Sequence, residues 1–541
     1  MDIEFNKNED HLRNLVSQLR QTAEQIELGG GKKSIDKQHE KNKKTARERL
    51  DYLLDKNAPF VEIGKFVGYG LYPEFGGCPA GGTVAGIGYI SGKQCVVVAN
   101  DQTVKAGAWF PITGKKNLRL QEIAMENHLP IIYLVDSAGV FLPLQDEIFP
   151  DKEHFGRIFR NNAKISAMGI PQIAAVMGAC VAGGAYLPIM SDETLMVEGN
   201  GSVFLAGSYL VKAAIGEDVD NESLGGAQMH ANVSGTADAT FKTEEECLDH
   251  IRKLVGLFAD KPKAGFNRIK AQAPSKDPAS IYGLFPRDGK PYDTYELLSC
   301  IVDKDSFQPY KQDYGKTMVC GYARIEGWAV GIVANQRKIV KSGRGEMQMG
   351  GVIYNDGADK AARFILNCNQ KKIPLVFFQD VTGFMVGSRS EQSGIIKDGA
   401  KLVNAVANSV VPKFTVITGN SFGAGNYALC GKAYDPRLIV AWPTAKIAVM
   451  GGESAAKTLL QIEVAAQKAK GKEVDPATEK ELLARIQKKY EEQMNPLYAA
   501  ARLWIDDIID PVNTREILAQ GIAAANENPT IPPFQTGVFQ V

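Results

Sequence analysis

The sequence lacks the features that mark membrane proteins, secreted proteins and nucleic-acid-binding proteins. It carries 62 Lys and Arg against 62 Asp and Glu, so the formal net charge is zero and no overall field attracts nucleic acid or an anionic membrane. No apolar run reaches the roughly 18 residues that a membrane-spanning helix needs, and the polar start "MDIEFNKNED" is unlike a secretory signal. We therefore expect a cytoplasmic protein with no nucleic-acid partner and no membrane insertion.

Motifs for metal binding and phosphate binding are missing as well. The eight cysteines are scattered without a CxxC pair, so we expect buried, reduced thiols and no metal site. Neither the phosphate-binding loop GxxxxGK[ST] nor the zinc motif HExxH occurs, and all six histidines precede residue 251. A kinase and a zinc enzyme are therefore disfavoured.

What the sequence does contain is a long internal repeat. With 541 residues the chain exceeds the size of one hydrophobic core, so two large domains are expected. Four segments recur in the same order and at nearly constant spacing, and the pairs are 96–101 with 331–336, 129–139 with 373–383, 170–186 with 411–427, and 192–207 with 435–451. Chance apolar runs would not keep both order and spacing, so the sequence predicts a duplicated domain.

The repeated segments predict an α/β fold with two similar domains. Each is a short run rich in Val and Ile that ends in Asp, Gly or Asn, which is typical of strands buried on both faces. Between them, residues 115–128 and 358–372 have apolar positions at helical spacing, which favours largely parallel sheets. Residues 260–293 are rich in Pro and Lys and read as the connection, so we place the domains at 1–270 and 271–541.

Two further stretches combine helical periodicity with heavy charge. They cover residues 33–57 and 457–493. We interpret both as helices with a solvated face.

The third pair of segments ends in two glycine-rich turns, "GACVAGGAY" (178–186) and "GNSFGAGNY" (419–427). Glycine adopts the required dihedral angles and has no side chain in the way, so adjacent backbone N–H groups can point outward at the start of a helix and stabilise an oxyanion. The predicted catalytic donors are Ala182, Gly183, Gly184, Gly423, Ala424 and Gly425. The alternative is that these glycines only allow close strand–helix packing, which the duplication disfavours.

Two oxyanion sites without a neighbouring side-chain base restrict the chemistry. Both substrates would have to become enolate-like, and one would have to bring its own base. Carboxyl transfer between carboxybiotin and an acyl thioester has these properties. A hydratase or isomerase would need Asp or Glu beside Gly183, and "VAGGAYLPIM" supplies none. A non-enzymatic scaffold for a biotin-bearing protein is the remaining alternative, and donors in both halves disfavour it.

Longer segments resemble the carboxyltransferase subunits of biotin-dependent acyl-CoA carboxylases, whose two halves are both crotonase-like. The segments that carry the resemblance include "VVVANDQTVKAGAWFPIT", "IFPDKEHFGRIF", "AGGAYLPIMSDETLMV", "TGFMVGSRSEQSGIIKDGAKLVNAVA" and "FGAGNYALCGKAYDPR". The resemblance runs from about residue 45 to residue 541 and is greatest to the methylcrotonyl-type enzymes, which implies 3-methylcrotonyl-CoA as the acyl substrate.

The resemblance also implies roles for individual residues. The first half would bind acyl-CoA with the triplet at Ala182 on the thioester enolate, and the second half would receive biotin with the triplet at Gly423 on the ureido oxygen. The implied ligand-binding residues are Lys115, Lys116 and Arg119 for CoA phosphates, and Phe384, Met385 and Tyr427 in the reaction cleft. The alternatives are an exposed helix face for the cations, a plain turn for Phe384 and Met385, and core packing for Tyr427 and its counterpart Tyr186.

Partners and substrate follow from what the family needs. No biotinylation sequence of the AMKM type and no ATP-binding carboxylase domain is visible, so biotin would arrive on a biotin carboxylase or biotin carrier subunit. The resemblance implies a homo-oligomer with a hexameric core, in which the site lies between the first half of one subunit and the second half of another. Residues 337–359 look longer than in methylcrotonyl enzymes and resemble decarboxylases of the glutaconyl-CoA type. A decarboxylase, or a carboxylase for propionyl-CoA or geranyl-CoA, therefore stays open.

Overall fold

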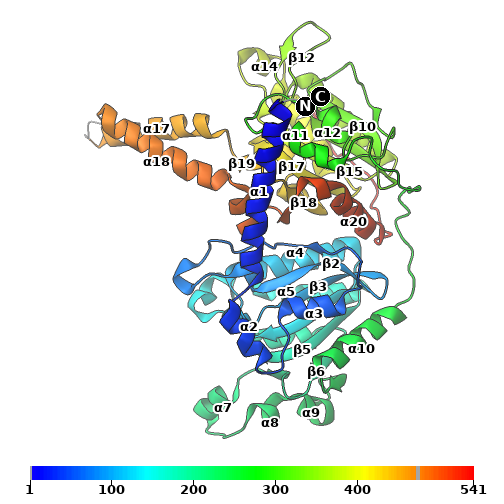
Figure 1. Ribbon diagram of the computed structural model, residues 1–541, viewed down its shortest axis with the longest axis vertical. Coiled ribbons are helices and arrows are strands. Elements are labelled where there is room, and N and C mark those ends of the chain that lie inside the picture. The colour runs from blue at the N-terminus through cyan, green and yellow to red at the C-terminus, as the bar shows by residue number, and fades with distance from the viewer. Residues whose placement is uncertain (1–2, 471–474) are drawn as a thin grey trace.

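The computed structural model describes residues 3–470 and 475–541, and these form two α/β units, drawn one above the other in Figure 1. Each unit is built around its own eight-stranded sheet. The connection after α10 (Glu244–Leu257) has little regular structure and runs along the side of the molecule from the lower unit to the upper one (Figure 1). The domain boundary near residue 270 falls in this connection and stays a prediction.

The sheets of the two units have the same strand order. In the first unit the strands are β1 (Val61–Glu62), β2 (Thr83–Ile90), β3 (Lys93–Asn100), β4 (Ile131–Ser137), β5 (Gln172–Val181), β6 (Glu193–Val197) and β8 (Ala239–Phe241), with β7 (Ser202–Phe204) beside β5. In the second they are β9 (Gln308–Pro309), β10 (Met318–Ile325), β11 (Trp328–Asn335), β15 (Leu375–Val381), β17 (Lys413–Phe422), β18 (Leu438–Ala441) and β20 (Asp507–Ile508), with β19 (Lys446–Ala448) beside β17. The predicted duplication is confirmed.

Burial explains why these segments read as apolar runs. Every residue of β4 and of β15 is buried, because helices and neighbouring strands cover both faces. The predicted helices are α4 (Pro111–Asn127) and α13 (Asn355–Gln370), and both carry many buried residues. Within the two large sheets, the strand pairs from β3 to β8 and from β11 to β20 are parallel, whereas the first strands of each sheet pair antiparallel. The carboxyl ends of the parallel strands therefore meet at one edge of each sheet.

The N-terminal helix α1 (Ile3–Glu27) joins the two units. It begins beside the second unit and runs down to the first, as Figure 1 shows. The Asn8 amide donates to the Gly283 carbonyl at 3.1 Å, and Arg20 forms an ion pair with Asp510 at 2.7 Å. Leu12 and Val16 of the same helix are buried in the main hydrophobic core. The polar sequence of α1 does not indicate that this helix packs on the second unit.

The two charge-rich stretches are helical as expected. α17 (Gly452–Ala469) and α18 (Pro476–Met494) form a hairpin that projects from the body (Figure 1), while residues 471–474 of this stretch lie outside the described residues. The other stretch forms α2 (Lys32–His39) and α3 (Ala46–Leu53). α3 begins at Thr45, whose hydroxyl accepts from the Glu48 N–H in a capping box. Its inner face is buried and carries Arg49, so only its outer face is solvated.

Candidate functional site

The first glycine-rich turn joins β5 to the short helix α6 (Gly183–Ile189). Ala182 has φ 53° and ψ −125°, and its N–H donates to the Phe204 carbonyl of β7 at 3.0 Å. The N–H groups of Gly183 and Gly184 open α6, and neither has an acceptor in the part of the chain that the structure describes. Two adjacent backbone donors are therefore available at this turn.

The second turn repeats this geometry at the start of α16 (Ala424–Ala428). Gly423 has φ 54° and ψ −143°, and its N–H donates to the Ala448 carbonyl of β19 at 3.0 Å. The next two N–H groups, of Ala424 and Gly425, have no acceptor among the described residues. The predicted triplets are thereby corrected to pairs. Ala182 and Gly423 shape the turns, but the sheets occupy their N–H groups.

Steric packing also requires glycine at both turns. A Cβ on Gly183 would lie 2.4 Å from Cε1 of Phe155, and a Cβ on Gly425 would lie 2.6 Å from Cγ2 of Val381. A Cβ on Gly184 would meet nothing closer than 3.5 Å. The packing interpretation of these glycines therefore holds at Gly183 and Gly425, and it is compatible with free N–H groups at the same positions.

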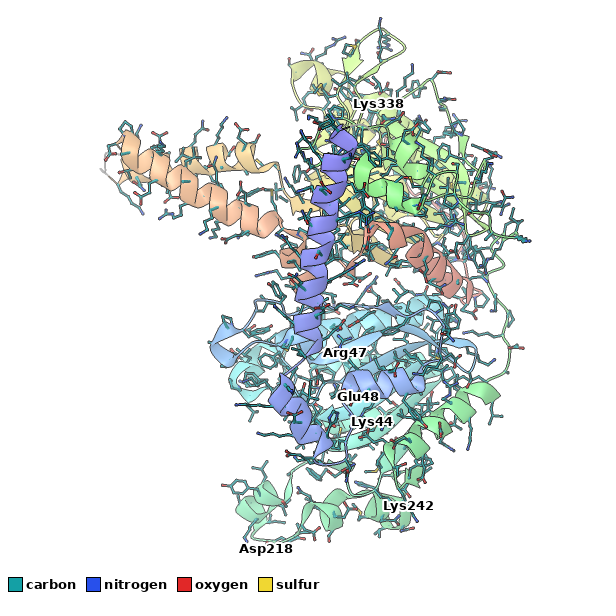
Figure 2. The ribbon with its side chains drawn as sticks, in the orientation of Figure 1. Lys44, Arg47, Glu48, Asp218, Lys242 and Lys338 are labelled. Carbon is teal, nitrogen blue, oxygen red and sulfur yellow. The ribbon has the colours of Figure 1, made fainter. Side chains whose placement is uncertain are left out.

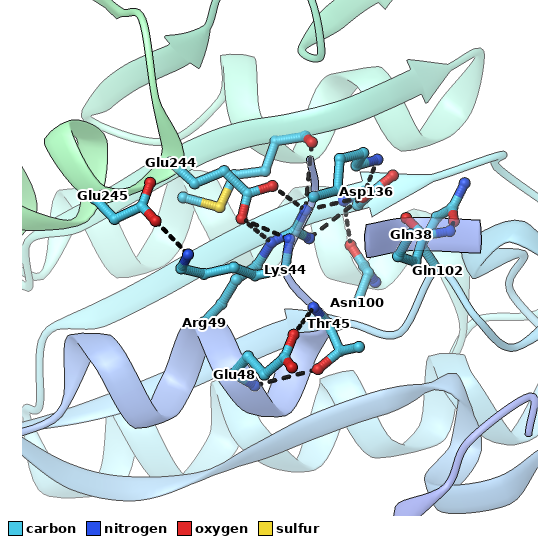
Figure 3. A network of polar contacts seen from close by, with 12 residues as sticks. Gln38, Lys44, Thr45, Glu48, Arg49, Asn100, Gln102, Asp136, Glu244 and Glu245 are labelled. Atoms are coloured by element: carbon cyan, nitrogen blue, oxygen red, sulfur yellow. Dashed lines mark hydrogen bonds and ion pairs between the residues drawn. The ribbon is translucent and has the colours of Figure 1, made fainter. Parts of the chain in front are cut away.

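A buried ionic network surrounds Arg49 and Asp136 in the first unit (Figure 3). Asp136, near the end of β4, receives the Arg49 guanidinium at 3.2 Å and the Lys43 ammonium at 2.6 Å. Arg49 also binds Glu244 at 2.6 Å, and the side chains of Arg49, Asp136 and Glu244 are at most 2% exposed. A Cβ on Gly178 would overlap the Asp136 carboxylate at 1.8 Å, which explains the glycine there. The sequence did not predict this network, because Asp136 and Glu244 lie 87 and 195 residues from Arg49 along the chain.

Asp136 is linked to the turn through the next residue. The Ser137 hydroxyl donates to the Gly107 carbonyl at 2.7 Å and accepts from the Gly139 N–H at 3.1 Å. Gly139 in turn lies next to Gly184. A Cβ added to Gly184 would have the Gly139 Cα as its nearest neighbour, at 3.5 Å. The position of the donor pair therefore depends on Asp136 and Ser137.

The second unit keeps an aspartate in the corresponding place but surrounds it differently. Asp380 accepts from the Tyr292 hydroxyl at 3.1 Å and forms an ion pair with Arg337 at 3.1 Å. Burial raises the pKa of Asp380, and the Arg337 charge opposes this shift. The next residue, Val381, is the one that packs against Gly425. Comparison of "LVDSAG" with "FQDVTG" in the two halves could have singled out both aspartates.

A cavity of about 780 Å³ opens beside the second turn. Gly423 and Ala424 line it together with the rings of Tyr427, Tyr498 and Trp504. The Tyr427 side chain is half-exposed, and so is its counterpart in the first unit, so the core-packing interpretation of these tyrosines is wrong.

A second cavity, of about 550 Å³, lies in the first unit. Lys37, Lys41 and Lys105 line it, all three are exposed, and no Asp or Glu is among its described lining residues. Ala106 also lines this cavity, and its carbonyl accepts from the Ala138 N–H at 3.0 Å, two residues from the Asp136 network. The cavity is therefore cationic and is directly connected to the support of the first turn.

Of the cations that sequence analysis singled out, two lie in the interior. The Lys116 ammonium donates to three carbonyls, those of Gly64, Ala80 and Thr83, at 3.0, 2.9 and 2.5 Å. Burial lowers the pKa of Lys116 to about 8.

Arg119 is equally inaccessible, because it forms two hydrogen bonds of 2.9 Å to the buried carboxylate of Asp506. We therefore do not retain Lys116 or Arg119 as CoA ligands. Lys115 is exposed and donates to the Arg502 carbonyl at 2.7 Å.

Phe384 and Met385 are tied to the long segment 337–359. Phe384 belongs to β16 (Gly383–Phe384), which pairs with β14 (Val352–Ile353), and the Met385 N–H donates to the Ile353 carbonyl at 2.9 Å. Upstream, β12 (Val340–Lys341) and β13 (Met347–Gln348) form a hairpin. Lys338 of this segment is exposed in the upper unit (Figure 2). The roles of Phe384 and Met385 in a cleft stay predictions.

The second turn also contains the pattern GxSxG at residues 419–423, which is found in serine hydrolases. Ser421 is fully buried, its hydroxyl donates to the Gln379 side chain at 2.6 Å, and it accepts from the Asn426 amide at 2.8 Å. No histidine occurs after His250. Ser421 therefore supports the turn and does not act as a nucleophile.

Residues 37–538 match the family described as the carboxyl transferase domain. The chain belongs to this family. The carboxyl transferase is 45% identical over 533 residues to the biotin-dependent 3-methylcrotonyl-coenzyme A carboxylase β1 subunit of Mycobacterium tuberculosis, with 98% of each chain covered. It is 33% identical over 513 residues to the methylmalonyl-CoA decarboxylase α subunit of Veillonella parvula, which covers 94% of this chain and 95% of that one.

Solved structures agree with this assignment. The crystal structure of the geranyl-CoA carboxylase β subunit of P. aeruginosa matches the carboxyl transferase with a TM-score of 0.86 and 37% identity, covering 100% of this chain and 98% of that one. The predicted family and the predicted duplicated α/β fold are confirmed.

The described residues of the carboxyl transferase, 3–470 and 475–541, include no helix that is long and apolar enough to cross a membrane. Within the same ranges, no group of three or more His, Cys, Asp or Glu side chains is placed to hold a metal ion. All eight cysteines are buried and free.

Proposed function

We propose that this protein transfers a carboxyl group from carboxybiotin, carried by a partner subunit, to 3-methylcrotonyl-CoA. The observation that carries the proposal is the pair of equivalent turns, at Gly183 and Gly184 and at Ala424 and Gly425. Each has two adjacent N–H groups without an acceptor within residues 3–470 and 475–541. The identity of 45% to a methylcrotonyl-CoA carboxylase subunit supports the choice of substrate.

The turns would act on the two reacting groups separately. When bound, carboxybiotin supplies the carboxyl group and the base that removes a proton from the acyl group. The N–H groups of Gly183 and Gly184 would hold the thioester oxygen while negative charge develops on it. Those of Ala424 and Gly425 would hold the ureido oxygen. Removal of one such donor typically costs about 10²–10³ in rate, so backbone groups are sufficient for catalysis without a side-chain base.

The cationic cavity of the first unit would provide a place for the phosphates of CoA. Lys37, Lys41 and Lys105 line it, no Asp or Glu is among its described lining residues, and ammonium groups bind phosphate as point charges. This assignment replaces Lys116 and Arg119, whose side chains are buried. Lys105→Ala should raise the KM for acyl-CoA and leave kcat unchanged, because the phosphates bind equally in the ground state and the transition state. Lys164→Ala, at an exposed lysine of the first unit that does not line the cavity, is the matched control.

The partner would be a biotin carrier joined to a biotin carboxylase. Several relatives are named as β subunits or β chains, which supports a separate subunit for biotin. We further propose a cytoplasmic homo-oligomer with a hexameric core, in which the first turn of one copy faces the second turn of another. Two donor pairs on separate units of one chain support such an arrangement.

The first experiment measures transfer of labelled carboxyl from a carboxylated biotin carrier to 3-methylcrotonyl-, propionyl-, geranyl- and crotonyl-CoA. Preferential labelling of 3-methylcrotonyl-CoA is the expected result. If no acyl-CoA were labelled, and the carboxyl group of glutaconyl- or methylmalonyl-CoA were instead transferred to biotin, the protein would be a decarboxylase. The 33% identity to the methylmalonyl-CoA decarboxylase α subunit makes decarboxylation the second candidate function.

A further inference from the structure

The cavity beside the second turn has one charged residue among its described lining residues. Seventeen residues line it, most of them apolar or aromatic, and Lys432 alone carries a charge. Because its walls include Ile417, Ile439 and Trp504, water screens a charge there poorly. A cation in such a cavity is a strong attractant for an anion.

Lys432 is held in place by a carboxylate that it shares with a second cation. Its ammonium lies 2.6 Å from Oδ1 of Asp506, which is fully buried. Arg119 of the first unit occupies both oxygens of the same carboxylate at 2.9 Å, and the Ile439 N–H also donates to it at 2.9 Å. Glu122 forms a further ion pair with Arg119 at 2.5 Å, so two carboxylates balance the two cations. Among the described residues the Lys432 ammonium donates to Asp506 alone, which leaves two of its three donor positions for a ligand.

We propose that Lys432 binds the anionic carboxyl group of the biotin-linked substrate in this cavity, next to the N–H groups of Ala424 and Gly425. The inference rests on the proposed function, because it assumes that the second turn receives biotin. A charge-assisted hydrogen bond from the ammonium would fix the carboxyl group, and the backbone donors would then address the ureido oxygen.

The protonation of Lys432 makes the proposal testable by pH. Burial, and next the charge of Arg119, lower the pKa of Lys432 to about 8, although Asp506 and Glu122 oppose the shift. Three tyrosines also line the cavity, Tyr427, Tyr490 and Tyr498, and the Tyr490 hydroxyl donates to the Met450 carbonyl at 3.0 Å. The cation is present below pH 8 and is lost above it, so binding of the anionic substrate should weaken by up to tenfold per pH unit above pH 8.

The experiment compares the full chain with Lys432→Arg and Lys432→Met in transfer from a carboxylated biotin carrier between pH 6.5 and 9.5. Arginine stays charged throughout this range, so Lys432→Arg should keep most of the activity, and its activity should not decrease above pH 8. Lys432→Met should lower kcat/KM for the carrier by about ten- to a hundredfold at pH 7 and leave the KM for acyl-CoA unchanged. Lys338→Met is the control, since Lys338 lies in the same unit but pairs with Asp293 outside the cavity.

Two results would overturn the role of Lys432. One is that the transfer activity of Lys432→Arg falls above pH 8 as steeply as that of the wild type. The other is that folded Lys432→Met has the same kcat/KM for the carrier as the wild type. A purely structural role would lower the melting temperature of the variants without altering the pH profile. Absence of transfer by the wild type at every pH would instead refute the proposed function, which keeps the two failures distinct.

Discussion

Replacement of Gly425 by alanine tests whether the position of the second donor pair matters. Gly425 does not have a positive φ, so alanine is compatible with its backbone. The new Cβ would lie 2.6 Å from Cγ2 and 3.0 Å from Cγ1 of Val381, whereas carbon atoms in contact lie about 3.5–4.0 Å apart. The turn, or β15 that carries Val381, must therefore move by about 1 Å. A displacement of this size typically costs about 10²-fold in rate, or about 2.7 kcal/mol of transition-state stabilisation.

The assay is steady-state carboxyl transfer from a carboxylated biotin carrier to 3-methylcrotonyl-CoA, with a thermal melt of each variant. Gly184→Ala is the matched control in the first unit, because its Cβ would find its nearest neighbour at 3.5 Å, an ordinary contact. In the double variant Gly425→Ala/Val381→Ala the nearest remaining atom is the Cβ of residue 381, at 3.4 Å, so activity should partly return. Full activity in Gly425→Ala, or a loss in Gly184→Ala as large as in Gly425→Ala, would refute the reasoning.

Three buried groups give further predictions. Lys116→Met leaves three carbonyls without their donor, so it should lower the melting temperature while the KM for acyl-CoA stays unchanged; a raised KM would restore Lys116 as a ligand. Asp506→Asn leaves Arg119 without its buried counter-charge and should destabilise the fold by about 3–5 kcal/mol, and an unchanged urea midpoint would contradict this. Burial raises the pKa of Asp507 to about 8, above the roughly 3.9 of the unfolded chain, so the wild type loses stability as pH rises from 4 to 8. Asp507→Asn should not lose stability in this way. The melting temperature of the wild type should therefore fall, relative to that of Asp507→Asn, as the pH rises towards 8.

The sequence was sufficient to predict the sheets and the two turns. Strands buried on both faces read as continuous apolar runs, and their repetition made β4 and β15 recognisable as a pair. The turns were visible because glycines cluster where a strand gives way to a helix. Which N–H groups stay free was not visible, because it depends on the pairing of β7 and β19 with the ends of β5 and β17.

The side chains around the site were harder to predict because their partners are remote in sequence. Lys116 sits on a helix among charged residues and looked exposed, but the carbonyls that bind it come from residues 33 to 52 positions earlier. The partner of Arg119 is 387 residues away. No local pattern records such contacts, and a buried cation therefore has the same appearance in the sequence as a solvated one.

The docking of α1 on the second unit has a consequence for synthesis of the chain. Arg20 leaves the ribosome first, but its partner Asp510 follows 490 residues later. At about 5–20 residues per second, roughly 25–100 s pass before the helix can reach its final place. During that time the apolar side chains of Leu12 and Val16 lack the second-unit surface that finally helps to cover them. Newborn chains are thus open to capture by chaperones at helix α1 until the segment that carries Asp510 has been made.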